Sequence, residues 1–568
     1  MQSFRKIFLL LDEKKSQLPV MVSFFALIGL FDLITLYLIQ PVIAKFTGTD
    51  LNFSGIIFIE KLFNVELDIF GLLIVLIIAF ILKFNAAIYL NYTIVNFAQT
   101  HQTYTRMKLF KTISFRTVYE FQKKPVTDYV YAIHVLAQQY TNNVLTPVMR
   151  SLSDVVIGFM VLGYLMYSSW QLTILIILTF SCGYFFYTSI FKRRLTRYGK
   201  ATTQASADIT ALATESFSGF RELTVFHAFE TLSKRLHTFC TKYGDNFLRY
   251  TLISTMPRYF FELIFSLSIG LMLLFFHISE TSSSTGFELL AVFILASMRL
   301  LPTMHQSSQL KLLLKFNEDC MDRLLELWSD GKQHGFTPRK PYFDNSKNVS
   351  VLVDNIAFQY DEKIFGNVNC EFQSSDHIAI TGPSGVGKST FLDIILGFVQ
   401  PTHGNVIRKV GGEEVSPQDF WSNCAYISQN SVIFSGTLRE NLTMFSEVGD
   451  FDLHRAREAI KFAQLDNLFL EDSENFEFKI DQFGNNLSGG QKQRLSWARA
   501  YYSNAAVIVV DEGTSALDEN TEFKLLEEIS QKLNDRLIIF VTHKPERLKS
   551  FTQKLELSKS GLNVMKLE

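Results

Sequence analysis

Residues 377–390 read His-Ile-Ala-Ile-Thr-Gly-Pro-Ser-Gly-Val-Gly-Lys-Ser-Thr, an apolar run that leads directly into a glycine-rich loop. The run predicts a buried strand, and a helical pattern begins where the loop ends. Glycines let backbone N–H groups wrap phosphates at a helix N-terminus, so this stretch predicts a nucleotide-binding strand, loop and helix. The loop residues are Gly382, Pro383, Ser384, Gly385, Val386, Gly387, Lys388, Ser389 and Thr390. We expect Lys388 to contact the β- and γ-phosphates of ATP, and the Ser389 hydroxyl to ligate Mg²⁺.

A second apolar run, residues 507–510, ends in the acidic pair Asp511 and Glu512. The run predicts a buried strand, and α/β sheets place their sites at the carboxyl ends of strands. Asp511 is suited to hold a water on Mg²⁺. Glu512 is suited to polarise the water that attacks the γ-phosphate. The pair gains its significance from the motifs around it, because an acidic pair after one apolar run is common.

The sequence Leu-Ser-Gly-Gly-Gln lies shortly before this pair, and it is formed by Leu487, Ser488, Gly489, Gly490 and Gln491. With this motif in this place, the chain resembles the ATPases of ABC transporters. The resemblance implies that Tyr360 stacks on adenine and that Gln429 senses Mg²⁺ and the transmembrane domain. It also implies that Asp518 belongs to the D-loop and that His543 is the switch histidine facing the γ-phosphate. Without these companions, His543 reads as an ordinary core or surface histidine.

The same resemblance implies a dimer, because ABC ATPases hold ATP between the phosphate loop of one subunit and the signature loop of the other. Ser488 and Gly490 would then act on the partner's nucleotide. All the motifs are intact, which favours a homodimer with two competent sites. Two positions depart from the family pattern: Gln482 replaces an acidic residue before the signature, and Gly513 replaces a common alanine. We expect the exchange at Gly513 to be tolerated.

Composition indicates a membrane domain in the first part of the chain. Of the 568 residues, 48% are hydrophobic and 54 are phenylalanine, more than a soluble enzyme needs. The composition changes near residue 335, where long apolar runs give way to mixed α/β patterning. Six segments before it are long enough to cross a bilayer of about 30 Å hydrocarbon thickness. They are residues 18–40, 68–92, 144–167, 170–191, 252–277 and 286–305.

The charges and the cysteines indicate which partners to expect, how the chain is oriented in the membrane and whether its thiols are reduced. Its net charge of −1 gives no reason to expect a nucleic-acid partner. Basic residues before the first segment and after the fourth place those ends in the cytoplasm. We predict reduced, buried thiols for the scattered cysteines, since none of them forms a Cys-x-x-Cys pair. They are Cys182, Cys240, Cys320, Cys370 and Cys424.

The predicted architecture is a six-helix, all-α ABC exporter transmembrane domain followed by an α/β P-loop ATPase domain. The domains span residues 1–320 and 349–568, with a proline-containing linker at residues 321–348. The polar segments 93–143 and 192–251 are too long for simple loops, so we expect membrane helices to extend into the cytoplasm. The exporter resemblance implies two short coupling helices, which we place near residues 124–134 and 214–222.

Several ionisable residues lie inside the predicted spans, where each costs roughly 2.5–3.5 kcal/mol to insert near the bilayer centre. One reading is a positively charged cavity for an anionic head group. The alternative is structural ion pairing, such as Arg258 with Glu262 one helical turn away, or snorkelling to an interface. The intramembrane residues are Asp32, Lys83, Arg258, Glu262 and Arg299.

Four stretches look similar to bacterial flippases for lipid-linked oligosaccharides: residues 4–11, 57–65, 256–259 and 299–302. That resemblance implies an external helix at residues 57–65 that engages the lipid tail. It also implies cavity cations for a pyrophosphate at Lys83, Arg258 and Arg299, where Lys83 departs from arginine and offers a point charge.

These features predict an ATP-hydrolysing exporter in the bacterial cytoplasmic membrane, with its ATPase domain in the cytoplasm. The expected cargo is an amphipathic substrate, a polyprenyl-pyrophosphate oligosaccharide first. An exporter of peptides, toxins or drugs carries the same motifs and stays open as an alternative. An ATP-gated channel or regulatory subunit is a further alternative, which the intact Glu512 and His543 disfavour. A soluble ABC protein is excluded by six membrane spans.

Overall fold

The structure of the chain is a computed structural model in which two compact units are separable. The first unit comprises Met1–Arg116 and Lys124–Gly335, and the second comprises Thr117–Lys123 and Phe336–Glu568. The described residues are 2–47, 68–168, 170, 173–174, 177–178, 181, 197–198, 201–202, 204–206, 208–278, 293–294, 297, 300–303, 306–307, 309–311, 313–330, 348–359, 363–446, 451–469, 476–548, 551–558 and 561–566.

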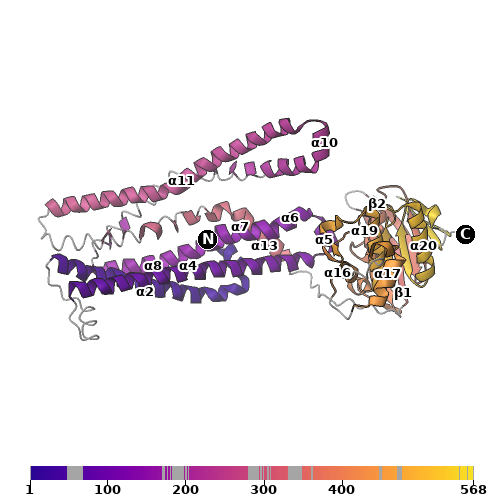
Figure 1. Ribbon diagram of the computed structural model, residues 1–568, viewed down its shortest axis with the longest axis horizontal. Helices are drawn as coiled ribbons and strands as arrows, with labels where there is room; N and C mark the ends of the chain where they lie inside the picture. The colour runs from indigo at the N-terminus through magenta and orange to yellow at the C-terminus, as the bar shows by residue number, and fades with distance from the viewer. Residues whose placement is uncertain are drawn as a thin grey trace. The chain divides into compact units, whose positions relative to one another are not determined.

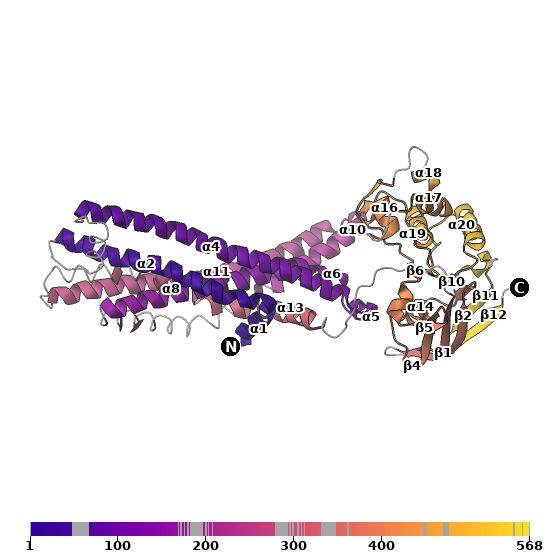
Figure 2. The same ribbon diagram turned by 90° about the horizontal axis from the view of Figure 1, so that it is seen from below.

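Unit 1 is built from helices (Figure 1). Its described helices are α1 (Gln2–Leu11), α2 (Leu18–Thr47), α4 (Ile69–Ser114), α6 (Val126–Tyr131), α7 (Ala137–Tyr140), α8 (Thr146–Ser168), α10 (Phe220–Val225), α11 (Phe229–Ile278) and α13 (Glu318–Asp330). A 3-10 turn at Asp12–Gln17 joins α1 to α2, and π-helical turns at Ala132–Leu136 and Thr141–Leu145 join α6, α7 and α8. Helix α2 packs extensively against α4 and against α8, α4 and α8 make a smaller contact, and Figures 1 and 2 show the three running side by side.

Three described helices are long and apolar enough to cross a membrane: Ser3–Ile43, Ile69–Ser114 and Asp128–Tyr167. They contain the predicted spans 18–40, 68–92 and 144–167, and the predicted span 252–277 lies within α11. The spans 170–191 and 286–305 fall largely outside the described residues. Helix α4 has 46 residues, which gives a length of about 69 Å, more than twice the hydrocarbon core. It therefore extends beyond the membrane, as the length of its polar segment predicts.

Many apolar side chains in the first part of α4 are more exposed than is usual for a surface in water. Phe80, Phe84 and Ile88 are 44%, 65% and 54% exposed in the isolated chain. A row of exposed aromatic and aliphatic side chains on one long helix is the pattern of a surface covered by lipid or by another helix.

The first coupling helix is predicted at the wrong place. Residues 126–131 belong to α6, the start of the long helix, whereas the separate short helix is α5 (Val118–Gln122). Thr117 caps α5 and Glu120 reciprocates, the capping-box signal that marks a helix start and that the sequence contains. The second short helix, α10, overlaps the predicted 214–222 only at its first residues, because Gly219 ends the preceding helical stretch.

The predicted linker begins later than residue 321. Residues up to Asp330 are helical in α13 and belong to unit 1, where Lys6 of α1 pairs with Glu318 at 3.2 Å and with Asp322 at 2.7 Å. Residues 331–347 lie outside the described part. Cysteines 240, 320, 370 and 424 are free thiols. Cys240 is exposed, contrary to the expectation of burial, and Cys182 lies outside the described residues.

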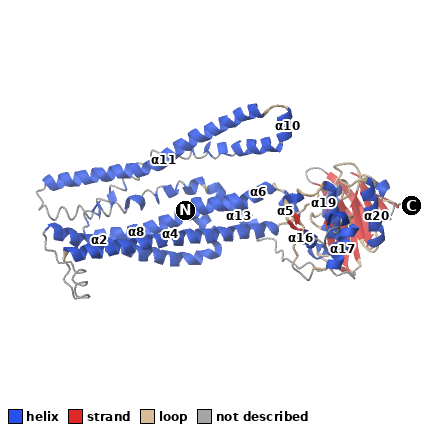
Figure 3. Ribbon diagram, in the orientation of Figure 1, coloured by secondary structure: helices blue, strands red, loops and turns tan. Residues whose placement is uncertain are grey.

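Unit 2 contains the strands of the protein that the structure describes (Figure 3). An antiparallel sheet has the order β2 (Lys363–Gln373), β1 (Val349–Gln359), β4 (His403–Val410), β5 (Glu413–Glu414). The central sheet has the order β12 (Gly561–Lys566), β11 (Gln553–Ser558), β3 (His377–Thr381), β10 (Leu537–Val541), β9 (Val507–Asp511), β6 (Cys424–Ile427). A short pair joins β7 (Gly436–Thr437) to β8 (Lys479–Ile480). The central sheet is parallel from β11 to β6, and only β12 runs antiparallel.

Helices flank the central sheet of unit 2. They are α14 (Lys388–Leu396), α15 (Pro417–Trp421), α16 (Leu438–Thr443), α17 (Leu453–Phe462), α18 (Asp466–Phe469), α19 (Gly489–Ser503) and α20 (Glu519–Lys532), with 3-10 turns at Gln482–Gly484 and Pro545–Arg547. Every residue of β3, β9 and β10 is buried, as expected for parallel strands covered on both faces. Ile380 pairs with Val541, and Val541 with Asp511, so the carboxyl ends of three central strands meet at one edge. The predicted motifs follow directly at that edge.

Candidate functional site

The phosphate loop leaves β3 and enters α14 through glycines that no larger residue could replace. Gly387 caps α14 with a φ of +97°, and a Cβ placed there would lie 2.4 Å from Cγ2 of Ile364. Gly382 has a φ of +149°, and its Cβ would lie 2.5 Å from the Leu557 carbonyl oxygen. Both positions combine backbone geometry that favours glycine with a lack of space. The loop backbone therefore lies free of side chains at the N-terminus of α14, where an anion binds best.

Lys388 turns its ammonium back into this loop. The side chain is buried, and Nζ donates hydrogen bonds to the carbonyl oxygens of Gly382 (3.0 Å) and Pro383 (3.1 Å). A cation held by the backbone of a loop at a helix N-terminus adds positive charge where phosphate oxygens bind.

Ser389, in the first turn of α14, meets Asp511, the last residue of β9. Ser389 Oγ donates a hydrogen bond of 2.8 Å to Asp511 Oδ2. Burial raises the pKa of Asp511, and the Ser389 hydroxyl opposes this by stabilising the charged form. A hydroxyl and a carboxylate that already touch form an oxygen donor set of the kind Mg²⁺ prefers, so these residues fit the ion that the sequence predicts.

Glu512 is the residue on which the site converges. Its carboxylate Oε1 lies 2.9 Å from His543 Nε2, and Oε2 accepts a hydrogen bond of 2.7 Å from Gln429 Nε2. Its backbone has a φ of +54°, a strained value for a side-chain-bearing residue, and its N–H donates to the Val541 carbonyl. His543 after β10 and Gln429 after β6 thus both contact the carboxylate of Glu512, which follows β9.

The signature residues form the start of α19. Ser488 caps the helix: its Oγ accepts from the Gln491 N–H at 3.3 Å, and the Gln491 amide oxygen accepts from the Ser488 N–H at 2.7 Å. A Cβ on Gly490 would lie 3.1 Å from the Ala516 carbonyl oxygen, so the glycine allows α19 to approach the segment before Asp518 closely. Leu487 is buried and anchors the loop in the core.

Asp518, the predicted D-loop residue, caps α20 by accepting from the Thr521 N–H at 3.1 Å. Hydrogen bonding by the Thr521 side chain, and then by the Thr521 backbone N–H, lowers the pKa of Asp518. Gln482 lies in the 3-10 turn Gln482–Gly484, where the following residue, Phe483, has a left-handed backbone and is 69% exposed. Tyr360 lies outside the described residues.

Gln493 is a residue of the site that the sequence analysis missed. It is buried on α19, donates 3.0 Å to Ser515 Oγ and 3.4 Å to the Gln429 carbonyl, and accepts 2.9 Å from the Ala516 N–H. One amide thus joins the signature helix to Gln429 and to the segment after Glu512. The available signal was weak: a neutral polar residue at a core position of α19, two residues after Gln491.

Gly513 lies where the packing leaves no room for a larger side chain. A Cβ at this position would lie 2.6 Å from Val510 Cγ1 and 2.9 Å from Ile427 Cγ2, and the Gly513 carbonyl accepts a hydrogen bond from buried Trp497. Contacts shorter than 3 Å require the neighbours to shift. An alanine at this position would therefore overpack the site, and the expectation that glycine is tolerated here stays a prediction.

The intramembrane cations carry partners. Lys83 Nζ on α4 lies 2.7 Å from Asp32 Oδ1 on α2, whose side chain is only 4% exposed. Arg258 Nε lies 3.0 Å from Glu262 Oε1, as the ion-pair alternative expects, and both side chains are more than 45% exposed. Two of the three candidate cavity cations are thus compensated, so an excess positive charge is not present at these described positions. Arg299 and the segment 57–65 lie outside the described residues.

Comparison with known proteins agrees with both halves of the chain. The family model of the ABC transporter transmembrane region matches residues 18–302, and the family model described as ABC transporter matches residues 365–515. The solved structure of a bacterial Atm1-family ABC exporter with ATP bound superposes with a TM-score of 0.75 at 17% identity, covering 96% of this chain and 95% of that chain.

Two curated relatives match over most of their length. The microcin-J25 export ATP-binding/permease protein McjD of Escherichia coli is 26% identical over 72% of this chain and 70% of its own. The ATP-dependent lipid A-core flippase of Ralstonia nicotianae is 22% identical over 77% of this chain and 74% of its own. In several other relatives the matched part of the chain spans only 28% to 38% of their length.

Proposed function

The chain belongs to the ABC transporter family, with a transmembrane region and an ABC ATPase domain on one polypeptide, and on that premise we propose that it exports an amphipathic substrate by hydrolysing ATP. We place it in the bacterial cytoplasmic membrane with unit 2 in the cytoplasm. The basic residues flanking the predicted spans and the bacterial relatives support this placement.

The observation that carries the ATPase proposal is the contact set of Glu512. A carboxylate that touches a histidine and a glutamine, next to a paired Ser389 and Asp511, has the parts needed for phosphoryl transfer to water. Glu512 would accept a proton from the attacking water, and His543 would fix the orientation of that carboxylate. Lys388 and the N-terminus of α14 would hold the phosphates. Mg²⁺ would supply charge neutralisation of the β- and γ-phosphates, held through Ser389, Asp511 and Gln429.

A second copy of the chain completes the site in this proposal. Each chain has one phosphate loop and one signature loop, and the signature motif begins α19 with Ser488 as its cap. A helix N-terminus of this kind favours a γ-phosphate presented by the partner. The full set of motifs supports a homodimer with two hydrolytic sites.

For the substrate we propose a polyprenyl-pyrophosphate oligosaccharide. The four segments similar to lipid-linked oligosaccharide flippases support this class, and so does the similarity to a relative named as a lipid A-core flippase. The charge pairs set a condition on the mechanism. An anionic head group would bind Lys83 only by displacing Asp32, and Arg258 only by displacing Glu262. Binding of the pyrophosphate would therefore require an ion pair to open.

Peptide export is the second candidate, and the similarity to a protein named as a microcin exporter favours it. A measurement of ATPase stimulation in nanodiscs separates the two. A polyprenyl-pyrophosphate glycan and a panel of amphipathic peptides are titrated against the same preparation, with Glu512→Gln as the background. Stimulation by the glycan alone supports the proposal, whereas stimulation by peptides alone overturns the substrate class. Absence of any ATP turnover in the wild type overturns the transporter reading in favour of an ATP-gated or regulatory role.

A further inference from the structure

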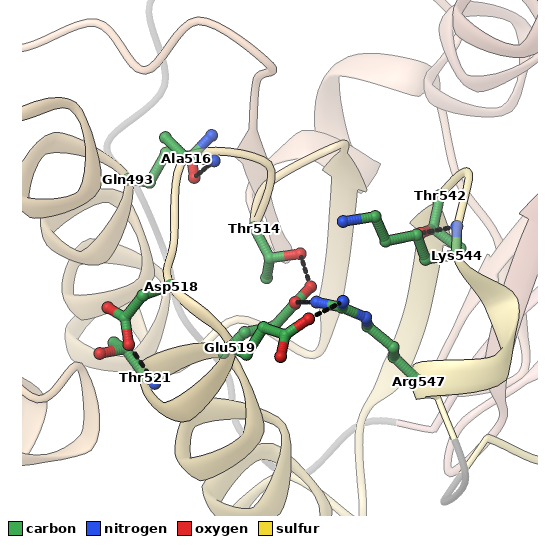
Figure 4. A network of polar contacts seen from close by, with 10 residues as sticks. Gln493, Thr514, Ala516, Asp518, Glu519, Thr521, Thr542, Lys544 and Arg547 are labelled. Atoms are coloured by element: carbon green, nitrogen blue, oxygen red, sulfur yellow. Dashed lines mark hydrogen bonds and ion pairs between the residues drawn. The ribbon is translucent and has the colours of Figure 1, made fainter.

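Arg547 connects the turn that follows His543 with the start of α20, two parts of the ATPase domain that belong to different sequence motifs. Arg547 is the last residue of the 3-10 turn Pro545–Arg547. This turn begins two residues after His543, which itself lies just beyond the end of β10. The guanidinium of Arg547 reaches the first turn of α20, where Nη1 lies 2.5 Å from Glu522 Oε2 and Nη2 lies 2.6 Å from Glu519 Oε1. Figure 4 shows Arg547 extending from the turn beyond Thr542 toward Glu519, with Thr514 on the far side of the same cluster.

Glu522 is the centre of this contact. One carboxylate oxygen pairs with Arg547, and the other accepts a hydrogen bond of 2.7 Å from Thr514 Oγ1. The Glu522 side chain is 11% exposed, in contrast to 84% for Glu519. A charge-assisted contact shielded from water is stronger than one at the surface, so Glu522 dominates and Glu519 adds little.

The other end of the contact lies beside the catalytic carboxylate. Thr514 follows Glu512 by two residues, and the next two residues, Ser515 and Ala516, are held by Gln493 of the signature helix. The segment of residues 512–518 is therefore fastened from two sides. The His543 turn holds it through Glu522, and the signature helix holds it through Gln493.

We propose that Arg547, Glu522 and Thr514 form a positioning relay that ties the turn carrying His543 to the segment between Glu512 and Asp518. The relay fixes Glu512 and His543 relative to each other, and it makes a displacement of His543 on nucleotide binding move residues 514–518 with it. These three residues do not contact the reacting atoms. The inference rests on the proposed ATPase function, because it assigns the relay to that reaction.

The test is the ATP dependence of hydrolysis by the full-length protein in nanodiscs. Thr514→Val removes the hydroxyl but keeps the shape, and Thr514→Ser keeps the hydroxyl. We expect Thr514→Val and Arg547→Ala to lower kcat roughly 10-fold while the KM for ATP changes less than about 2-fold, since misplaced catalytic groups affect the chemical step. Thr514→Ser should restore kcat to near the wild-type value.

Two carboxylates on one arginine provide the matched control. Glu522→Gln should reproduce the loss of kcat, and Glu519→Gln, which removes the exposed partner, should retain wild-type kinetics. The double variant Arg547→Ala with Glu522→Gln should be no slower than the slower single variant, because members of one relay are not additive.

Several outcomes overturn the relay: wild-type kcat in Thr514→Val and Arg547→Ala, equal loss in Glu519→Gln and Glu522→Gln, or multiplying losses in the double variant. A fall in kcat that tracks a lowered thermal midpoint in every variant, Thr514→Ser included, also overturns it in favour of a purely structural role. The proposed function fails separately, and visibly, if the wild type does not hydrolyse ATP.

Discussion

His543 Nε2 lies 2.9 Å from Glu512 Oε1, so the imidazole and the carboxylate are in direct contact at the ends of neighbouring strands β10 and β9. The other Glu512 oxygen accepts from Gln429. Both oxygens of the proposed base are engaged, so an attacking water shares an oxygen with one of these contacts or binds after that contact has loosened. Arrival of ATP and its metal at Ser389, Asp511 and Gln429 provides a physical reason for that change.

Glu512→Gln should separate ATP binding from hydrolysis. The amide keeps the shape and the contacts with His543 and Gln429 but cannot take a proton, and general-base catalysis contributes typically 10²- to 10⁴-fold. We expect turnover to fall by about that factor while the dissociation constant of a fluorescent ATP analogue changes little. Normal turnover in Glu512→Gln contradicts the assignment of the base, and the exposed Glu519→Gln serves as the control.

Asp393 makes the stability of the nucleotide-free protein depend on pH. Burial, and then the nearby Asp511 carboxylate, raise the pKa of Asp393 to about 6, above the usual value near 4. A raised pKa means that the folded state binds the proton more tightly. The stabilisation is complete below the unfolded pKa and is lost as the pH rises through about 6. When the pH rises from 4 to 6.5, the thermal midpoint of the wild type should therefore fall. In Asp393→Asn it should fall by less. The exposed Asp354→Asn should keep the wild-type slope.

Gly513→Ala should destabilise the ATPase domain because its methyl group would enter occupied space beside Val510 and Ile427. Overpacking of this kind costs typically 1–3 kcal/mol. Unfolding of the full-length protein, followed by tryptophan fluorescence, measures the loss. Gly244→Ala is the matched control, because a Cβ at Gly244 of α11 meets no atom within 4 Å. Equal stability of the two variants would contradict the packing argument.

The Asp32–Lys83 pair should behave as a structural unit of α2 and α4. Lys83→Met leaves a buried carboxylate without its cation, and breaking a buried pair from one side costs about 3–5 kcal/mol. We expect this variant to be poorly folded, and the double variant Asp32→Asn with Lys83→Met to recover the yield and thermal midpoint of the folded protein. Transport by the double variant then tells whether Lys83 also serves the substrate. Recovery of folding without transport supports a substrate role, and recovery of both contradicts it.

The sequence predicts which residues of the candidate nucleotide site lie close together, because each motif is local. Gly382, Lys388 and Ser389 follow one strand, and Asp511 and Glu512 follow another, so the topology of a parallel sheet is enough to bring them together. The helix boundaries are harder, since α5 is marked only by the Thr117–Glu120 capping box. Long-range contacts lie beyond pattern reading. No sequence motif predicts that Arg547 contacts Glu522, that Gln493 binds the Ala516 N–H, or that Lys83 of α4 pairs with Asp32 of α2.

ATP-driven movement of a lipid-linked glycan can be measured in a translocation assay. The purified protein is reconstituted in liposomes that contain a fluorescent polyprenyl-pyrophosphate oligosaccharide. The rate at which the head group becomes accessible on the side opposite the ATPase domains is then measured with ATP, in the wild type and in Glu512→Gln. We predict ATP-dependent exposure of the head group in the wild type and a strongly reduced rate in the variant. ATP hydrolysis without movement of the head group, or equal rates in both proteins, would contradict the claim.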